Sequence, residues 1–573
     1  MQKINPIAAA MKNLRGGFLA IAIFSFVLNI LMLAGPLYML QVYDRVLTSQ
    51  NMDTLIALSV LLIGVFLVIG CLELIRLRIL NRLGTRFELN TGVPVLEAAM
   101  RSKVLGSSQT GNNILADVNA FRDFLSGTTL IAFFDLPWVP MYIVILFVLH
   151  PYLGLMGLAG AIILTILALM NSSSSNKPMK NSAVSRQQSD GLFLTCERNA
   201  ELVQAMGMKT YLTRRWYYFQ SMTSQLKATV TDRIATYSTI SKTFRMALQS
   251  GILGLGAALT VAGESTAGVM IAATIILGRA LAPIDQAIGQ WRTFLAAMGS
   301  YRKIKDLTIK FPEEKQRTKL PFAEAKLTVA ISRAGPPLSQ TATLSGINFE
   351  LEAGDVMAVI GPSGSGKSTL AKMLAGIWQP QKGDVLFDGT ATSKLDKNDL
   401  GRQVGYLPQD VELFDGTLYE NISRFSDDHS DEKILKAARD SDVHDLVLDL
   451  EDGYETEIGR DGYFLSGGQR QRIGLARALY DDPFIVILDE PNSNLDATGD
   501  SALRNAVFSA KERGAIVVVM THRPAMLQAV NKVLVMNDGC QTAFGLKEEV
   551  LRATTKNVIE KKTVKPADDI QVA

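Results

Sequence analysis

The feature that most constrains this sequence is the distribution of its apolar residues. Windows close to the roughly 20 apolar residues that a helix needs to cross a bilayer occur only in about the first 300 residues. Their ranges are 17–40, 54–76, 129–149, 153–171, 245–263 and 267–289. A chain of 573 residues with a mean hydropathy of +0.18 is too long for one domain and too apolar to be wholly soluble. We therefore expect a bundle of six transmembrane helices followed by a domain in water.

Basic residues give the orientation of these helices. The short connections near His150–Pro151 and Gly263–Glu264 carry neither Lys nor Arg, whereas the long connections 77–128 and 172–244 are rich in both. The positive-inside rule places the long connections and both termini in the cytoplasm. Because the long connections have a helical pattern, we expect them to continue the spans well beyond the membrane.

The first apolar window could be a signal peptide or a span. It follows Lys3, Lys12 and Arg15, as the apolar core of a signal peptide would. Its apolar run is too long for one and lacks a small-residue cleavage site. We interpret it as a retained span.

A few polar residues lie within the spans, among them Asp135, Arg279 and Asp285. One interpretation is a polar pathway inside the bundle, because intramembrane charge is costly and usually faces a cavity. The other is that these residues lie near helix ends and reach the headgroups. The pattern weighs the two equally for Arg279 and favours the second for Asp135 and Asp285.

The composition changes near residue 300. A charged stretch with two prolines separates a membrane domain, 1–310, from a second domain, 326–550, and we interpret 311–325 as the linker. In the second domain short apolar strands alternate with helices, which is typical of an α/β domain with a buried sheet. The polar end, 551–573, is predicted to be a short helix that becomes a disordered tail.

Charge and cysteine content argue against nucleic-acid binding and against a metal site made of cysteines. A net charge of +3 is too mild for a chain that binds nucleic acid. Cys71, Cys196 and Cys540 are widely scattered and have no metal-ligand spacing. We interpret them as reduced packing residues.

Residues 361–369, GPSGSGKST, match the phosphate-binding pattern G-x-x-x-x-G-K-[ST] between a predicted strand and a predicted helix. The glycines let backbone N–H groups turn toward phosphates, Lys367 can reach the β- and γ-oxygens, and the Ser368 hydroxyl can bind Mg²⁺. The expected phosphate-binding set is Gly361, Pro362, Ser363, Gly364, Ser365, Gly366, Lys367, Ser368 and Thr369.

An acidic pair ends the apolar strand FIVILDEP, residues 484–491. Asp489 can hold the metal and Glu490 can polarise the attacking water. Two adjacent acids at the end of a buried strand are costly unless they meet a cation or donors. With the phosphate-binding loop, this pair predicts a phosphate-hydrolysis site.

The run LSGGQRQRIGLARAL, residues 465–479, offers a second place for an anion. Ser466 is a good N-cap, Gly467 and Gly468 allow close approach of the backbone, and helix formers follow. A helix start of this kind can receive an anion. One chain then holds two anion sites.

The order GPSGSGKST, LSGGQ, acidic strand and VVVMTHRP resembles the ATPase domain of ABC transporters over roughly residues 326–550. The resemblance implies that ATP and Mg²⁺ are the cofactors. It also implies that Ser466, Gly467, Gly468 and Gln469 close over the nucleotide held by a second copy. Because this chain has one set of motifs, the resemblance implies a homodimer with two shared sites.

Further positions match the family one by one. Gln409 resembles the glutamine that senses Mg²⁺ and water, His522 resembles the histidine that contacts the γ-phosphate and supports Glu490, and SNLD ends in Asp496. Asn494 stands where a smaller residue is commoner. The resemblance thus implies Glu490, His522 and Gln409 as catalytic, and Ser368, Gln409 and Asp489 as the Mg²⁺ set. The stretch 332–344 lacks the aromatic ring on which adenine usually stacks, so we name no adenine contact.

A membrane domain followed by an ATPase domain on one chain resembles an ABC exporter half-transporter. The stretches 412–425 and 454–462 resemble those by which exporter ATPase domains contact coupling helices. Importers generally keep the two functions on separate chains.

The strings at 35–55 and 133–143 resemble the permease/ATPase of type I secretion systems, in the protease, lipase and haemophore exporter subgroup. Interfacial anchoring would explain Tyr38, Tyr43 and Trp138 alone, but not the whole strings. The resemblance implies a bacterial inner-membrane location with the ATPase domain in the cytoplasm, and an unfolded cargo protein with a C-terminal signal. It also implies a periplasmic membrane-fusion adaptor and a TolC-like outer-membrane channel as partners.

About 16 residues precede the first span, so we expect no N-terminal peptidase domain. A lipid or drug exporter of the same architecture is the alternative function. A regulatory or scaffold module on a membrane anchor is a third possibility, against which Glu490, His522 and LSGGQ argue, because each serves turnover rather than folding.

Overall fold

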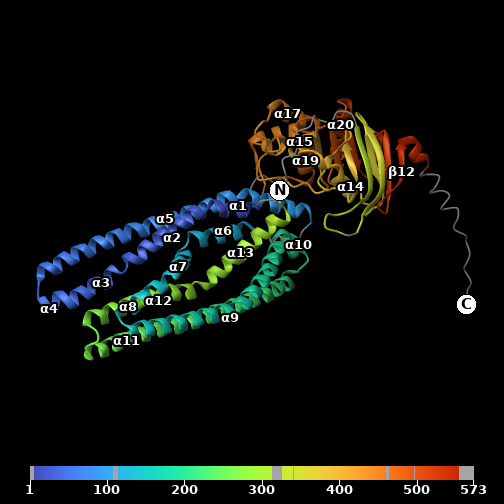
Figure 1. Ribbon diagram of the computed structural model, residues 1–573. Helices are drawn as coiled ribbons and strands as arrows, with labels where there is room; N and C mark the ends of the chain where they lie inside the picture. The colour runs from blue at the N-terminus through green and yellow to red at the C-terminus, as the bar shows by residue number, and fades with distance from the viewer. Residues whose placement is uncertain are drawn as a thin grey trace, which may run out of the picture. The chain divides into compact units, whose positions relative to one another are not determined.

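The computed structural model describes residues 5–106, 114–312, 326–339, 341–459, 464–495 and 497–553. The chain divides into two compact units, one made of residues 1–103 and 108–313 and the other of residues 104–107 and 314–573 (Figure 1). The division falls within the predicted linker 311–325. Most of that linker and residues 554–573 of the predicted tail lie outside the described residues. Residues 547–553, before the tail, are helical.

The first unit is entirely helical where it is described. Its elements are α1 Pro6–Asn13, α2 Arg15–Leu31, α3 Ala34–Gln41, η1 Val42–Val46, α4 Leu47–Ser49, α5 Met52–Val104, α6 Ile114–Ser126, α7 Thr128–Asp135, η2 Leu136–Trp138, α8 Val139–Leu149, α9 Pro151–Arg198, α10 Ala200–Ala205, α11 Lys209–Val261, α12 Ala267–Gly289 and α13 Trp291–Lys310.

Six stretches of helix among the described residues are long and apolar enough to cross a membrane, which confirms the predicted number of spans. They are Arg15–Ser49, Met52–Val104, Thr128–Leu149, Pro151–Arg198, Lys209–Val261 and Ala267–Gly289. The helices α5 and α11 each have 53 residues. At 1.5 Å per residue each is about 80 Å long, far more than the roughly 30 Å of a bilayer core. Both helices are therefore longer than a bilayer core, as the expected extensions beyond the membrane require; Figure 1 shows their length.

The last span, α12, forms the centre of this unit. It packs against α8, α9 and α11, and half of its most apolar window is buried. Leu146 of α8, Leu153 of α9 and Leu277 of α12 are fully enclosed in the same apolar core. Small residues such as Gly157 let α9 and α8 approach closely, because a Cβ at Gly157 would lie 2.7 Å from Leu146 Cδ1.

The first span is not one continuous α-helix, and a π-helix lies within the stretch 35–55. A turn separates α2 from α3, and the π-helix η1 places Asp44 against the start of α12. Asp44 Oδ1 accepts from the Gly268 N–H at 2.9 Å, and Asp44 Oδ2 accepts from the Thr266 hydroxyl at 2.7 Å. A carboxylate at the positive end of a helix is favourable, so Asp44 ties the first span to the last.

The second unit is an α/β domain. Its strands are β1 Lys326–Ala334, β2 Leu344–Glu352, β3 Val356–Ile360, β4 Lys382–Phe387, β5 Thr390–Ala391, β6 Val404–Leu407, β7 Gly416–Thr417, β8 Glu457–Ile458, β9 Ile485–Asp489, β10 Ile516–Met520, β11 Lys532–Asn537 and β12 Cys540–Leu546. Its helices are α14 Lys367–Leu374, η3 Thr392–Lys394, α15 Lys397–Gln403, α16 Leu418–Ile422, α17 Asp431–Asp440, α18 His444–Leu448, η4 Gly453–Glu455, α19 Gly467–Leu479, α20 Ala497–Glu512 and η5 Pro524–Gln528.

The described strands form one ten-stranded sheet in the order β5-β4-β1-β2-β12-β11-β3-β10-β9-β6, and β7 pairs with β8. The strands β11, β3, β10, β9 and β6 are parallel neighbours, whereas β1, β2 and β4 pair antiparallel. The residues of β9 and β10 are buried throughout, as expected of parallel strands covered on both faces. This arrangement confirms the predicted α/β fold with a buried sheet.

Candidate nucleotide-binding site

Four neighbouring parallel strands bring most of the predicted site residues to one edge of the sheet. The order of these strands is β3, β10, β9 and β6. Loop 361–369 follows β3, His522 follows β10, Glu490 follows β9 and Gln409 follows β6. Because parallel strands end at the same edge, residues far apart in the sequence meet there, as ligands commonly do in such sheets.

The phosphate-binding loop depends on its glycines. Gly364 and Gly366 have φ values of 81° and 93°, a region that residues with a Cβ rarely adopt. A Cβ on Gly361 would collide with the Met536 carbonyl oxygen of β11. The backbone can therefore curl tightly between β3 and α14, and this curl turns N–H groups inward.

Lys367 and Ser365 show that the loop is built to receive an anion. Lys367 is only 6% exposed, and its Nζ donates to the carbonyls of Gly361 at 2.9 Å and Pro362 at 3.0 Å. The buried Ser365 Oγ has no hydrogen-bond partner among the described residues. A buried hydroxyl without a partner and a cation folded over its own loop both fit a phosphate group.

Ser368 and Asp489 bring together two oxygen atoms of the kind that can bind Mg²⁺. The Ser368 hydroxyl donates to Asp489 Oδ1 at 3.1 Å. Asp489 is 2% exposed, and this burial raises the pKa of Asp489 above its usual value, although the Ser368 hydrogen bond acts in the opposite direction. A bound cation would stabilise the ionised carboxylate here, and Mg²⁺ is commonly held by one or two such ligands plus substrate phosphates.

The Glu490 carboxylate lies between the predicted glutamine and histidine. Glu490 Oε2 accepts from Gln409 Nε2 at 3.3 Å, and Glu490 Oε1 lies 3.9 Å from His522 Nδ1. The His522 side chain is 67% exposed, so it faces the solvent side of this group. The structure thus brings together all three residues expected to be catalytic, around a carboxylate that can accept a proton.

The LSGGQ loop contacts a different part of the domain. Ser466 and Gln469 form a capping box at the start of α19. A Cβ on Gly467 or Gly468 would find Asn494 as its nearest neighbour, and no atom of loop 361–369 is among these neighbours in the part of the chain that the structure describes. Asp496 lies outside the described residues. In one chain the structure therefore does not join the LSGGQ loop to the phosphate-binding loop.

Gln471 makes buried contacts near Glu490 that the sequence motifs did not predict. Its side chain is buried and hydrogen bonded to the turn that follows Glu490. The available signal was its position, because Gln471 lies four residues before Leu475 and eight before Leu479, on the face of α19 that packs inward.

The polar residues within the spans correct one expectation. We expected Asp135 and Asp285 to reach the headgroups, but each is paired with an arginine. Asp135 Oδ1 accepts from Arg76 Nη1 at 3.1 Å, and Asp285 Oδ2 lies 2.6 Å from Arg245 Nε. Arg279 is exposed in the single chain, so both interpretations stay open for it.

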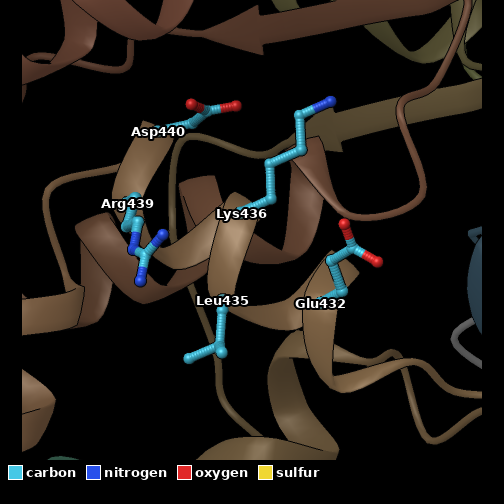
Figure 2. Close-up of a pocket in the computed structure, with 5 residues that line it drawn as sticks. All are labelled: Glu432, Leu435, Lys436, Arg439 and Asp440. Carbon is cyan, nitrogen blue, oxygen red and sulfur yellow. The ribbon is translucent and has the colours of Figure 1, made fainter.

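A hollow of about 290 Å³ lies on α17, and Figure 2 shows the side chains around it. It is lined by Glu432, Leu435, Lys436, Arg439 and Asp440. All five residues belong to one helix, α17. Lys436 forms an ion pair outside the hollow, with its Nζ 2.6 Å from Asp482 Oδ2. The hollow is a surface feature of α17, which carries none of the predicted site residues.

Comparison with known proteins identifies the family. The family described as ABC transporter transmembrane region matches residues 18–281, and the family described as ABC transporter matches residues 344–493. Over 545 residues the chain is 44% identical to the Type I secretion system ATP-binding protein PrsD of Rhizobium meliloti (strain 1021), covering 95% of this chain and 94% of that protein. The chain belongs to the ABC transporter family.

This ABC transporter is also 28% identical to the Leukotoxin translocation ATP-binding protein LktB of Mannheimia glucosida, over 93% of this chain and 76% of that protein. Its fold matches that of a bacterial Atm1-family ABC exporter with ATP bound, with a TM-score of 0.78 over 97% of this chain and 99% of that one. At 19% identity this likeness concerns the fold alone. The comparisons confirm an ATP-hydrolysing half-transporter and the resemblance to the ATPases of type I secretion.

Proposed function

We propose that this ABC transporter is the ATPase and permease of a type I secretion system, which exports an unfolded protein with a C-terminal signal. The observation that carries the proposal is the 44% identity, over nearly the whole chain, to a protein named for type I secretion. The relative named for leukotoxin translocation supports a polypeptide cargo. The partners would be a periplasmic membrane-fusion adaptor and a TolC-like outer-membrane channel. The distribution of basic residues supports an inner-membrane location with the ATPase unit in the cytoplasm.

The working unit in this proposal is a homodimer with two shared sites. Ser466 is exposed, and the loop around it packs against Asn494 of its own chain. The positive end of α19 is thus available to a second copy. In the dimer, Ser466 and Gly468 would face the γ-phosphate of an ATP held by the partner's phosphate-binding loop.

The residues of the nucleotide site have separate tasks in this proposal. Lys367 and the loop N–H groups would hold the phosphates, while Ser368, Asp489 and Gln409 would hold Mg²⁺. Mg²⁺, when bound, neutralises charge that develops on the phosphate oxygens.

Proton transfer falls to the group around Glu490. The Glu490 carboxylate accepts the proton of the attacking water, and Gln409 and His522 fix its orientation. Asp496, which follows the acidic strand in the sequence, would contribute to nucleotide binding.

The test is a secretion assay in Gram-negative cells that carry the adaptor and the channel. Fragments containing the C-terminal ends of candidate proteins should reach the medium with the natural chain and stay inside with Glu490→Gln, at equal amounts of membrane-inserted protein. Export of these fragments that is indifferent to Glu490→Gln, or ATP-driven movement of a lipid or drug in place of the fragments, would overturn the proposal.

A further inference from the structure

The side-chain amide of Gln471 binds one turn of the ATPase unit through both its nitrogen and its oxygen atom. The side chain is 2% exposed and lies on α19, one turn after that helix begins. Its Nε2 donates to the Pro491 carbonyl, to the Glu490 carbonyl at 3.5 Å and to the Ser493 hydroxyl at 3.4 Å. Its Oε1 accepts from the Asn494 N–H at 3.1 Å. All four contacts fall within residues 490–494, so Gln471 fastens this turn to α19.

The fastened turn starts from an unfavourable backbone conformation. Glu490 has a φ of 50°, which a residue with a Cβ adopts only where its surroundings enforce it. On one side the Glu490 N–H donates to the Met520 carbonyl of β10 at 3.0 Å. On the other side Gln471 holds the carbonyls that follow. The direction of the Glu490 side chain, toward Gln409 and His522, depends on both restraints.

The start of α19 rests on the same turn. A Cβ on Gly468 would lie 3.0 Å from the Asn494 carbonyl oxygen, so the LSGGQ backbone is in close contact with it. Gln471 therefore joins two parts of the chain that the proposed function assigns to different sites of the dimer. Glu490 acts on the nucleotide of its own chain, and the LSGGQ loop acts on that of the partner.

We propose that Gln471 is a positioning residue for ATP hydrolysis, which fixes the turn 490–494 so that the Glu490 carboxylate stays where it can accept a proton. This inference rests on the role of Glu490 in the proposed function. A purely structural Gln471 would affect folding but not the step that Glu490 performs. The two roles differ in how kcat, KM and stability change together.

The experiment measures ATP hydrolysis by the full-length protein in lipid nanodiscs. Gln471→Leu removes all four contacts, and Gln471→Glu keeps the size of the side chain but loses both donors. Both changes should lower kcat about 10- to 100-fold, the effect typical of a misplaced catalytic group, with unchanged KM for ATP. The matched control is Arg472→Leu, the next residue of α19, which contacts Asp442 at 3.4 Å and should keep the kcat of the natural chain. Equal thermal stability of the two Gln471 variants and the control excludes loss of folded protein.

A second measurement combines the changes. In the Glu490→Gln background, Gln471→Leu should cause no further loss of hydrolysis, because a residue that acts through Glu490 has nothing left to position. A further loss in that background, or normal kcat in Gln471→Glu, would overturn this proposal while leaving the role of Glu490 intact. Unchanged hydrolysis in Glu490→Gln alone would overturn both.

Discussion

Asp135→Ala should markedly lower the free energy of unfolding of the membrane unit. Its carboxylate neutralises Arg76, whose side chain is 3% exposed among the first three spans. Arg76 Nη1 lies 3.1 Å from Asp135 Oδ1 and 3.1 Å from Ser25 Oγ, and Arg76 Nη2 lies 3.5 Å from Glu73 Oε1. Removing the aspartate leaves the guanidinium charge enclosed in the bundle, and its remaining partners among the described residues are the Ser25 hydroxyl and the half-exposed Glu73 carboxylate.

The magnitude follows from these contacts. Breaking a buried ion pair by removing one partner costs about 3–5 kcal/mol of stability. Because Arg76 keeps its contacts to Ser25 and Glu73, we expect Asp135→Ala to cost about 3 kcal/mol, the lower end of this range. A neutral hydrogen bond between membrane helices averages only about 0.6 kcal/mol. The difference is large enough to identify the interaction as a charge pair.

The assay is the free energy of unfolding, measured by adding sodium dodecyl sulfate to protein in mild detergent. Asp135→Ala, Arg76→Leu and the double variant form a cycle, and their coupling energy should be about 2 kcal/mol or more, so that the double variant loses less than the sum of the singles. Glu73→Gln is the control and should cost less than about 1 kcal/mol, because its carboxylate is half-exposed. Single changes that each cost under about 1 kcal/mol and add without coupling would refute the reasoning.

Three further predictions follow from the ATPase unit. A mixed dimer with Ser466→Arg in one chain and Lys367→Ala in the other should keep one intact shared site and hydrolyse ATP, whereas both changes in one chain should abolish hydrolysis; the opposite distribution of activity would exclude shared sites. Burial lowers the pKa of Arg424 to about 10, so it stays charged at neutral pH, and its guanidinium donates to four backbone carbonyls at the ends of α15 and α19. Arg424→Ala should therefore lower the free energy of unfolding by about 3 kcal/mol in a denaturant titration, and a loss below about 1 kcal/mol would contradict this. Burial raises the pKa of Asp355, but hydrogen bonds from Lys532 and other donors outweigh it and hold the pKa below the usual 3.8. The resulting stability is present above pH 3.8 and is lost as the pH falls through the lowered pKa, so Asp355→Asn should flatten the acid side of the stability profile, and an unchanged profile would contradict the assignment.

Much of this protein could be predicted from the sequence because the signals are local. A span is a continuous apolar run, since every backbone N–H and C=O in lipid must be bonded within its own helix. The phosphate-binding loop is likewise a short, continuous pattern, with glycines where φ must be positive and Lys367 at a fixed offset. Each of these features is complete within a few turns of chain.

Pairing between distant residues could not be predicted in this way. The sequence alone favoured headgroup contact for Asp135, and only the packing of the spans showed Arg76, 59 residues away, as its partner. Likewise Gln409 and Glu490 are 81 residues apart, and the order of β6, β9 and β10 decides that they meet.

The sequence by itself determined which segments are apolar enough to cross a membrane and which loop has the phosphate-binding pattern, because hydropathy and backbone conformation are properties of short segments. Only the tertiary structure decided that Gln471 holds the turn after Glu490, and that Asp44 ties the first span to the last. Such contacts depend on strand order and helix packing, which bring together side chains whose spacing along the chain carries no signal of its own.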